Sequence, residues 1–117
     1  MKITIFIGGL SGGGAERVAC NLSNYLFNKQ HEVDIITMSE TPNIYGLQKE
    51  VKQYILLKNS ERNNKIAENY KRYKRLKKYI MDHRDNTYIV FLPITICLLL
   101  HFSKFIKGNI IASERNK

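Results

Sequence analysis

The N-terminal segment leaves few folds open, because a short apolar run ends at a cluster of glycines and a helical pattern follows at once. Residues Lys2–Ile7 are rich in β-branched and aromatic side chains, and five glycines lie within Gly8–Gly14. A continuous apolar stretch bounded by glycines is typical of a central strand that is covered on both faces. In the next segment, Ala15–Lys29, apolar side chains recur at helical spacing. This order predicts the first half of a βαβ unit.

The rest of the chain repeats the alternation of strand and helix. The expected strands are His31–Met38, Val51–Leu57, Thr87–Leu92 and Asn109–Ala112. A loop is expected at Ser39–Gly46, and helices are expected at Asn63–His83 and Ile94–Phe105. Gly108 is the expected C-cap of the second of these helices. Such alternation implies right-handed crossovers around a parallel sheet. The 117 residues suit a single domain. We therefore expect an α/β fold: a Rossmann-like, doubly wound parallel sheet spanning residues 1–117.

The long helix expected at Asn63–His83 carries two contrasting sets of side chains. An apolar stripe is predicted from residues spaced by three or four: Ile66, Tyr70, Tyr73, Leu76 and Ile80. Six cations are expected to cover its other faces: Lys71, Arg72, Lys74, Arg75, Lys77 and Lys78. A run of this kind is usually a solvated helix face, but its cations also suit an anionic lipid leaflet. Both interpretations stay open at the level of sequence.

The net charge of +9 favours polyanionic partners, which include nucleic acid, anionic membranes and phosphorylated small molecules. No nucleic-acid-binding motif accompanies the charge, so we expect no nucleic-acid partner.

The apolar run Tyr88–Phe102 contains Pro93 and is shorter than the roughly twenty residues that span a bilayer. Cys20 and Cys97 lie in apolar surroundings and are expected to be reduced. We expect a cytoplasmic chain, with peripheral contact to the inner face of the plasma membrane as a hypothesis.

The glycine loop Gly8–Gly14 is expected to let a phosphate-bearing ligand approach the backbone, since the helix after it offers free N–H groups and a positive dipole end. Two common glycine patterns fail here. The phosphate-binding GxxxxGK[ST] pattern needs a lysine directly after its last glycine. Counted from Gly8 that position is Gly14, and counted from Gly9 it is Ala15. The dinucleotide pattern GxGxxG needs a third glycine where Arg17 stands. A nucleoside triphosphatase or nicotinamide enzyme is therefore disfavoured.

Two segments near opposite ends of the chain carry a family resemblance. The run Gly13–Ala19 (GGAERVA), followed by Asn21-Leu22, resembles the N-terminus of family 4 glycosyltransferases. Ile111–Asn116 (IASERN) is similar to a segment that many members carry after their fifth strand. Val90–Pro93 is also similar, though less distinctive. The resemblance implies a GT-B enzyme, in which two Rossmann-like domains face a cleft, and this chain would form most of its acceptor-side, N-terminal domain.

The same resemblance suggests roles for individual residues. It implies that Gly12, Gly13 and Gly14 approach the donor phosphates, that Glu16 and Arg17 line the cleft beside them, and that Glu114, Arg115 and Asn116 line the acceptor side. For Glu16 and Arg17 a simple dipole or solvent role remains the rival reading. No histidine lies in Leu92–Cys97 and His101 is farther along a helix, so no catalytic base is assigned.

The activity that the resemblance implies is retaining transfer of a hexose or related sugar from a nucleotide sugar to a lipid-linked glycan acceptor, in polysaccharide or glycolipid assembly. It implies neither a metal nor a cofactor beyond the nucleotide sugar. The donor-binding domain, with the family's acidic Glu pair, would lie outside these 117 residues. The alternative is a non-catalytic half that binds an acceptor or works with a separate C-terminal chain.

Overall fold

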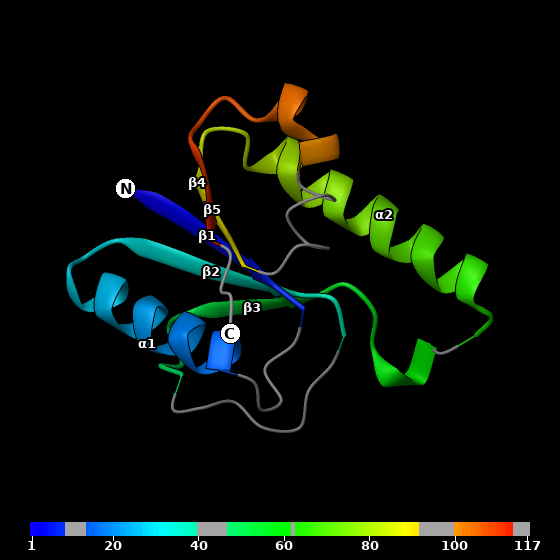
Figure 1. Ribbon diagram of the computed structural model, residues 1–117, viewed down its shortest axis with the longest axis horizontal. Helices are drawn as coiled ribbons and strands as arrows, with labels where there is room; N and C mark the ends of the chain where they lie inside the picture. The colour runs from blue at the N-terminus through cyan, green and yellow to red at the C-terminus, as the bar shows by residue number, and fades with distance from the viewer. Residues whose placement is uncertain (9–13, 40–46, 62, 92–99, 114–117) are drawn as a thin grey trace.

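The computed structural model describes residues 1–8, 14–39, 47–61, 63–91 and 100–113, without the side chains of residues 14–16, 59 and 113. Five parallel strands form one sheet in the order β3-β2-β1-β4-β5 (Figure 1). Their bounds are Lys2–Ile7 for β1, Glu32–Thr37 for β2, Lys52–Ile55 for β3, Thr87–Phe91 for β4 and Ile110–Ser113 for β5. The predicted Rossmann-like α/β sheet is confirmed, and the third strand is shorter than expected.

Strand β1 lies at the centre because its side chains are apolar on both faces. Ile5 is fully buried and is paired with Ile35 of β2 on one side and with Ile89 of β4 on the other. From β1 the chain adds β2 and β3 on one side and then crosses to add β4 and β5 on the other side. The direction of winding therefore reverses between β1 and β4, which makes this pair the topological switch point of the sheet.

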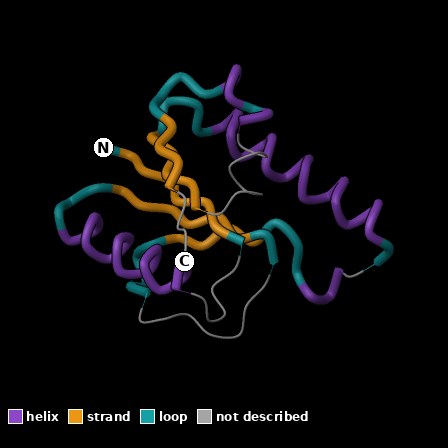
Figure 2. The backbone as a smooth tube through the Cα atoms, in the orientation of Figure 1, coloured by secondary structure: helices purple, strands orange, loops and turns teal. Residues whose placement is uncertain are grey.

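The helices cover opposite faces of the sheet (Figures 1 and 2). Helix α1, Gly14–Asn28, brings Ala19 and Cys20 onto a buried layer made by alternate strand residues such as Ile3, Ile5 and Val33. Helix α2, Lys65–Asp82, covers the other layer, which contains Phe6, Ile36, Tyr88 and Val90. Each such fully buried aliphatic or aromatic side chain stabilises the fold by about 1.5–3 kcal/mol. The period of two along each strand thus produces two separate core layers.

Helix α2 begins and ends close to the predicted positions. Asn64 is its N-cap, and its Oδ1 accepts a 2.9 Å hydrogen bond from the backbone N–H of Ala67. The predicted apolar stripe is correct only for its C-terminal half, where Leu76 and Ile80 are buried. It is wrong for Ile66, Tyr70 and Tyr73, which are 84%, 62% and 41% exposed. The N-terminal half of α2 extends past the sheet, so the stripe has no core to cover there (Figure 1). Tyr73 reaches only the margin of the core, where its ring centroid lies 5.0 Å from that of the buried Phe102.

The region between β4 and β5 also differs from the prediction. Residues 92–99, where the helix Ile94–Phe105 was expected to begin, lie outside the described residues. Leu100 and His101 are α-helical as expected, whereas Ser103–Phe105 forms a short 3₁₀ helix, η2, in place of α-helix. Gly108 is not the C-cap of an α-helix; its N–H donates to the carbonyl of Arg84, and a Cβ there would lie 2.2 Å from the carbonyl oxygen of Asn86. Gly108 is required for close backbone approach.

Three smaller expectations have mixed outcomes. The loop Ser39–Gly46 falls outside the described residues except for Ser39, and the turn before α2 contains a second 3₁₀ helix, η1, at Asn59–Glu61. Cys20 is buried and free as predicted, while Cys97 is not among the described residues. Within the described ranges, no helix has both the length and the apolar character needed to cross a membrane.

Candidate functional site

The candidate site lies at the carboxyl edge of the sheet, where open α/β folds bind ligands near the switch point. Strand β1 ends there, Gly8 follows it, and the first helix begins at Gly14 on the same side. The strand ladder continues past the strand ends. The N–H of Met38 donates a 3.0 Å hydrogen bond to the carbonyl of Gly8, and the N–H of Leu56 donates a 2.9 Å bond to that of Thr37. The hydrogen-bonded ladder therefore extends by one residue beyond β1, β2 and β3 at this edge.

Two of the predicted donor-side residues can be placed at this edge. Gly14 is the first residue of α1, and Arg17 lies in its first turn with an exposed side chain. The N-terminus of a 15-residue helix presents N–H groups that have no acceptor within the helix, together with the positive end of its dipole, and both attract a phosphate. Gly12 and Gly13 lie outside the described residues, and so does the side chain of Glu16.

The predicted acceptor-side residues Glu114, Arg115 and Asn116 also lie outside the described residues. The strand that precedes them can be placed. Strand β5 is parallel to β4 and is paired with it through Phe91 and Ser113, so both strands end at the same edge as β1. The two segments that carry the family resemblance therefore adjoin one edge of the sheet, although they are almost a chain length apart in sequence.

The two arginines of the basic segment bind the sheet. Nε of Arg72 donates to the carbonyl of Met38 at 3.0 Å, and its Nη2 donates to Oγ of Ser39 at 3.0 Å. Nη1 of Arg75 donates to the carbonyl of Leu56 at 3.0 Å, and both terminal nitrogens bind the carboxylate of Glu61 at 2.6–2.7 Å. Any membrane role of this segment therefore rests mainly on its four lysines.

The ion pair between Arg75 and Glu61 perturbs both groups. Hydrogen bonding from Arg75, followed by the backbone N–H of Lys58 at 3.0 Å, lowers the pKa of Glu61 from 4.5 to about 2. The hydrogen bond to Glu61 raises the pKa of Arg75 in turn. The pair joins the turn after β3 to the middle of α2, which is a structural use of these charges.

The lysines instead share the outer face of α2 with exposed apolar side chains. The ammonium groups of Lys74 and Lys77 lie 5.3 Å and 5.8 Å from the ring centroids of Tyr70 and Phe105, and Lys78 pairs with Asp82 at 3.2 Å. The exposed apolar residues of the helix are Ile66, Tyr70, Tyr73 and Met81. Sequence reasoning found the cations but placed most of these apolar residues in the core.

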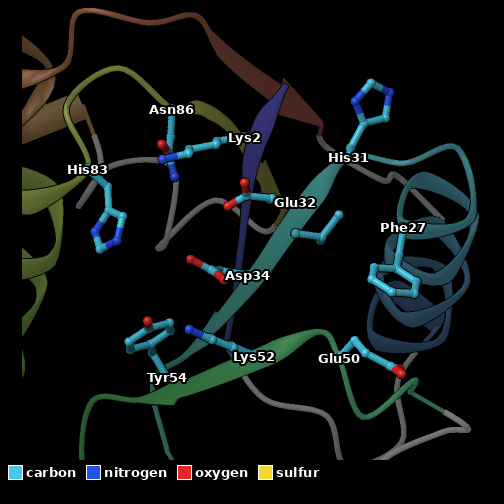
Figure 3. A pocket seen from close by; sticks show the side chains of 11 residues that line it. Lys2, Phe27, His31, Glu32, Asp34, Glu50, Lys52, Tyr54, His83 and Asn86 are labelled. Carbon is cyan, nitrogen blue, oxygen red and sulfur yellow. The ribbon is translucent and has the colours of Figure 1, made fainter.

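A polar pocket of about 300 Å³ lies at the opposite, amino-terminal edge of the sheet. Figure 3 shows Asp34 in its middle, with Lys52, Tyr54 and His83 around it. Behind the pocket, Tyr79 donates a 2.6 Å hydrogen bond to Asp34. Burial, and then this bond to Asp34, raise the pKa of the Tyr79 hydroxyl far above its usual value. Sequence reasoning missed this network, whose members are far apart in the chain.

The described residues show which metal-binding and acid–base groups lie at the two edges of the sheet. Nowhere in the described ranges do three or more His, Cys, Asp or Glu side chains form a group that could hold a metal ion. His101, which the sequence left without a catalytic role, is exposed, and its Nε2 lies 3.4 Å from the hydroxyl of Tyr73. The carboxyl edge therefore offers a helix N-terminus and a glycine-flanked backbone for binding a phosphate, and the described side chains there include no acid–base pair.

The sheet order and the position of the glycine loop define a Rossmann-like α/β domain with a candidate anion site at its switch point. No protein-family model matches the chain. The chain is 33% identical over 118 residues to the GalNAc-alpha-(1->4)-GalNAc-alpha-(1->3)-diNAcBac-PP-undecaprenol alpha-1,4-N-acetyl-D-galactosaminyltransferase of Campylobacter jejuni. The match covers 99% of this chain and 33% of that enzyme, so the chain spans about one third of its relative's length. The chain is related to a glycosyltransferase.

Proposed function

We propose that this chain forms the acceptor-side half of a retaining, family 4-like glycosyltransferase with a GT-B architecture. The reaction would transfer a sugar from a nucleotide sugar to a lipid-linked glycan during the assembly of a surface polysaccharide such as a capsule or lipopolysaccharide. The observation that carries the proposal is the 33% identity over the whole chain to an enzyme whose name specifies a glycan on undecaprenol pyrophosphate. The parallel sheet, with its glycine loop at the switch point, suits such a role.

In this proposal the carboxyl edge is one wall of the substrate cleft. Gly12, Gly13 and Gly14 let the donor phosphates approach the backbone, and the N-terminus of α1 stabilises their charge. Glu16 and Arg17 line the cleft beside them, and Arg17 can bind a phosphate through two N–H groups. Glu114, Arg115 and Asn116 follow β5 on the acceptor side. The nucleotide sugar is a co-substrate, and no metal or further cofactor takes part.

The outer face of α2 is the proposed contact with the cytoplasmic leaflet. Four lysines on this helix, Lys71, Lys74, Lys77 and Lys78, are exposed, and each near-surface cation adds about 1 kcal/mol of attraction to an anionic leaflet. Tyr70 and Tyr73 are exposed beside them, and amphipathic rings are favoured at the level of lipid headgroups. A lipid-linked acceptor makes such docking useful, because it brings the cleft to the plane in which the acceptor moves.

A second candidate is a non-catalytic half that binds an acceptor or completes a separate C-terminal chain. It shares with the first candidate the match to one third of the relative's length. The two candidates differ in what the chain does when the missing part is supplied. A catalytic half yields product once the donor-binding part is present, whereas a binding module yields none with any donor part.

Reconstitution tests the proposal. The chain is mixed or co-expressed with a polypeptide comprising the remaining two thirds of the Campylobacter enzyme, and transfer from radiolabelled uridine diphosphate N-acetylgalactosamine to an undecaprenol-pyrophosphate-linked glycan is measured. We expect labelled lipid only when both polypeptides are present. The control replaces Gly12 and Gly13 by valine, whose side chains would block the approach of the phosphates. Absence of product over a panel of nucleotide sugars, with both polypeptides folded, would favour the non-catalytic module.

A further inference from the structure

Arg72, in the basic segment of α2, binds three different residues through its guanidinium. Its guanidinium uses three donors on three acceptors: the carbonyl of Met38 at 3.0 Å, Oγ of Ser39 at 3.0 Å and Oδ1 of Asn69 at 3.2 Å. The first two acceptors lie directly after β2, and the third lies on α2 itself. A planar guanidinium can satisfy such a divergent set, whereas a lysine ammonium at the end of one flexible stem cannot.

Met38 is hydrogen-bonded both to Arg72 and to the backbone at the end of β1. Its carbonyl accepts from Arg72, while its own N–H donates a 3.0 Å hydrogen bond to the carbonyl of Gly8, the residue that follows β1 and opens the glycine loop. Met38 also packs against the core layer beneath α2. One residue thus links the middle of α2 to the end of the central strand.

Arg75 makes a parallel contact one strand farther out. It lies three residues after Arg72, which places both side chains on neighbouring positions of one helix face. It binds the carbonyl of Leu56, whose N–H donates to Thr37. The two carbonyls that the arginines bind therefore belong to the two residues that extend the ladder beyond β2 and β3. The lysines between and after the arginines instead contact Tyr70, Phe105 and Asp82.

We propose that Arg72 is a positioning residue of the candidate site, which fixes Met38 and, through it, Gly8, so that the backbone at the ends of β1 and β2 is held ready for the donor phosphates. The link to the donor rests on the proposed function, whereas the link to Gly8 rests on the contacts above. Arg72 acts from the inward side of the basic segment, through the three hydrogen bonds of its guanidinium.

Amide hydrogen exchange, followed by NMR on the 117-residue chain, tests the structural part. The same ladder between β1 and β2 supplies the reference, since the N–H of Glu32 donates to the carbonyl of Met1 at 3.0 Å at its other end. We expect Arg72→Lys to speed exchange of the Met38 amide relative to the Glu32 amide by at least about tenfold. The substitution keeps the positive charge but removes the planar guanidinium, whose donors bind several acceptors at once. Arg72→Gln should have at least the same effect.

Lys71→Gln is the matched control, because it removes one charge from the adjacent, exposed position of α2. It should leave the ratio of the two exchange rates unchanged. The proposal is overturned if Arg72→Lys leaves the ratio as in the parent chain, if Lys71→Gln changes it equally, or if both amides accelerate together. The last result would mean a general loss of stability with no positioning of the edge.

Kinetics in the reconstituted enzyme test the functional part. Loss of binding that is shared by ground state and transition state raises KM and leaves kcat unchanged. We expect Arg72→Lys to raise the KM for uridine diphosphate N-acetylgalactosamine by roughly threefold or more, with the KM for the lipid-linked acceptor unchanged. An unchanged donor KM alongside altered Met38 exchange would remove the donor role. If the unsubstituted chain makes no product after reconstitution, the proposed function fails. The exchange experiment still decides whether Arg72 positions Gly8, so the two failures can be distinguished.

Discussion

Nε of Arg72, in the middle of α2, donates a 3.0 Å hydrogen bond to the carbonyl of Met38, which lies just beyond β2. This contact distinguishes Arg72 from the neighbouring lysines of the basic segment, although all of them are cations in sequence. In Lys71–Lys78 the arginines face the sheet edge, and the lysines face outward beside exposed tyrosines. The division follows side-chain chemistry, since a guanidinium forms several fixed hydrogen bonds and an ammonium is a strongly hydrated point charge. The inner side of α2 therefore binds the sheet edge, and its outer side exposes lysines and tyrosines.

The outward lysines give the first prediction. Replacing Lys71, Lys74, Lys77 and Lys78 together by glutamine should weaken binding to vesicles containing phosphatidylglycerol by on the order of a thousandfold, because each contributes about 1 kcal/mol near an anionic surface. Sedimentation with the vesicles measures the change. The matched control replaces four other exposed lysines, namely Lys29, Lys49, Lys52 and Lys107. An equal loss in both variants would mean that only the net charge matters.

The second prediction concerns the pair of Glu61 and Arg75. The folded-state pKa of Glu61 is about 2, below its ordinary value of 4.5, so the unfolded chain binds the proton more tightly. The ionised carboxylate therefore contributes stability above about pH 4.5, and this contribution is lost as the pH falls toward 2. Glu61→Gln should reduce the free energy of unfolding at neutral pH, and the difference from the parent should shrink through this window. Urea unfolding at several pH values measures it; a difference independent of pH contradicts the ion pair as its cause.

Sequence reasoning predicted the doubly wound parallel sheet and most element positions because these depend on local pattern. Lys2–Ile7 is apolar on both faces, which only a central strand tolerates, and the glycines after it stop the strand within one residue of the predicted point. The helical period in Ala15–Lys29 gave α1 to within a residue at each end. Local pattern also led to the expectation of a ligand site at the carboxyl edge, since the carboxyl ends of parallel strands lie together there.

The parts that sequence missed depend on where a helix crosses the sheet. Periodicity showed that Ile66, Tyr70 and Leu76 share one face of a helix, but it carries no information on which turns lie over the core. The same limit hid the separate uses of Arg72 and Lys71, which are adjacent in sequence. The first question is decided by the direction of the crossover, which places the N-terminal turns of α2 beyond the sheet (Figure 1). The second is decided by the rotation of the helix about its axis, since successive residues point about 100° apart and only Arg72 is turned toward the end of β2.

Gly108 provides the third prediction. A Cβ at this position would lie 2.2 Å from the carbonyl oxygen of Asn86 and 2.8 Å from that of Asp85, both of which are backbone atoms that cannot turn away. Gly108→Ala should therefore lower the free energy of unfolding by about 1–3 kcal/mol, the usual cost of forcing an extra carbon into a filled space. Asn109→Ala, at the exposed neighbouring residue, should change it by less than about 0.5 kcal/mol. Equal urea midpoints for the two variants would show that the turn at Asp85 and Asn86 moves aside.

The fourth prediction tests the polar network between the sheet and α2. The hydroxyl of Tyr79 donates to Asp34 at 2.6 Å, and it lies 2.8 Å from Oγ1 of Thr4, which in turn accepts from Nδ2 of Asn86 at 2.9 Å. Since Tyr79 donates to the carboxylate, its oxygen accepts from Thr4. One hydroxyl therefore completes a chain of hydrogen bonds that joins β1, β2, α2 and the turn before β4.

Tyr79→Phe keeps the ring, which stacks on His83 at 4.1 Å between centroids, and removes only the hydroxyl. The buried hydroxyl of Thr4 then loses its acceptor and the carboxylate of Asp34 loses a donor. We expect the free energy of unfolding to fall by about 2–3 kcal/mol, in line with hydrogen bonds to charged or buried partners. Tyr73→Phe is the matched control: its hydroxyl is only 3.4 Å from an exposed histidine, His101, so its removal should cost little.

A double-mutant cycle with Thr4→Val separates this bond from the rest of the network. If the chain of hydrogen bonds acts as a unit, the two substitutions together should cost less than the sum of their separate effects, by about 0.5–3 kcal/mol. Strict additivity, or a Tyr79→Phe variant as stable as Tyr73→Phe, would mean that water replaces the lost hydroxyl at the adjoining pocket. Urea unfolding of the parent, the two single variants and the double variant decides between these outcomes.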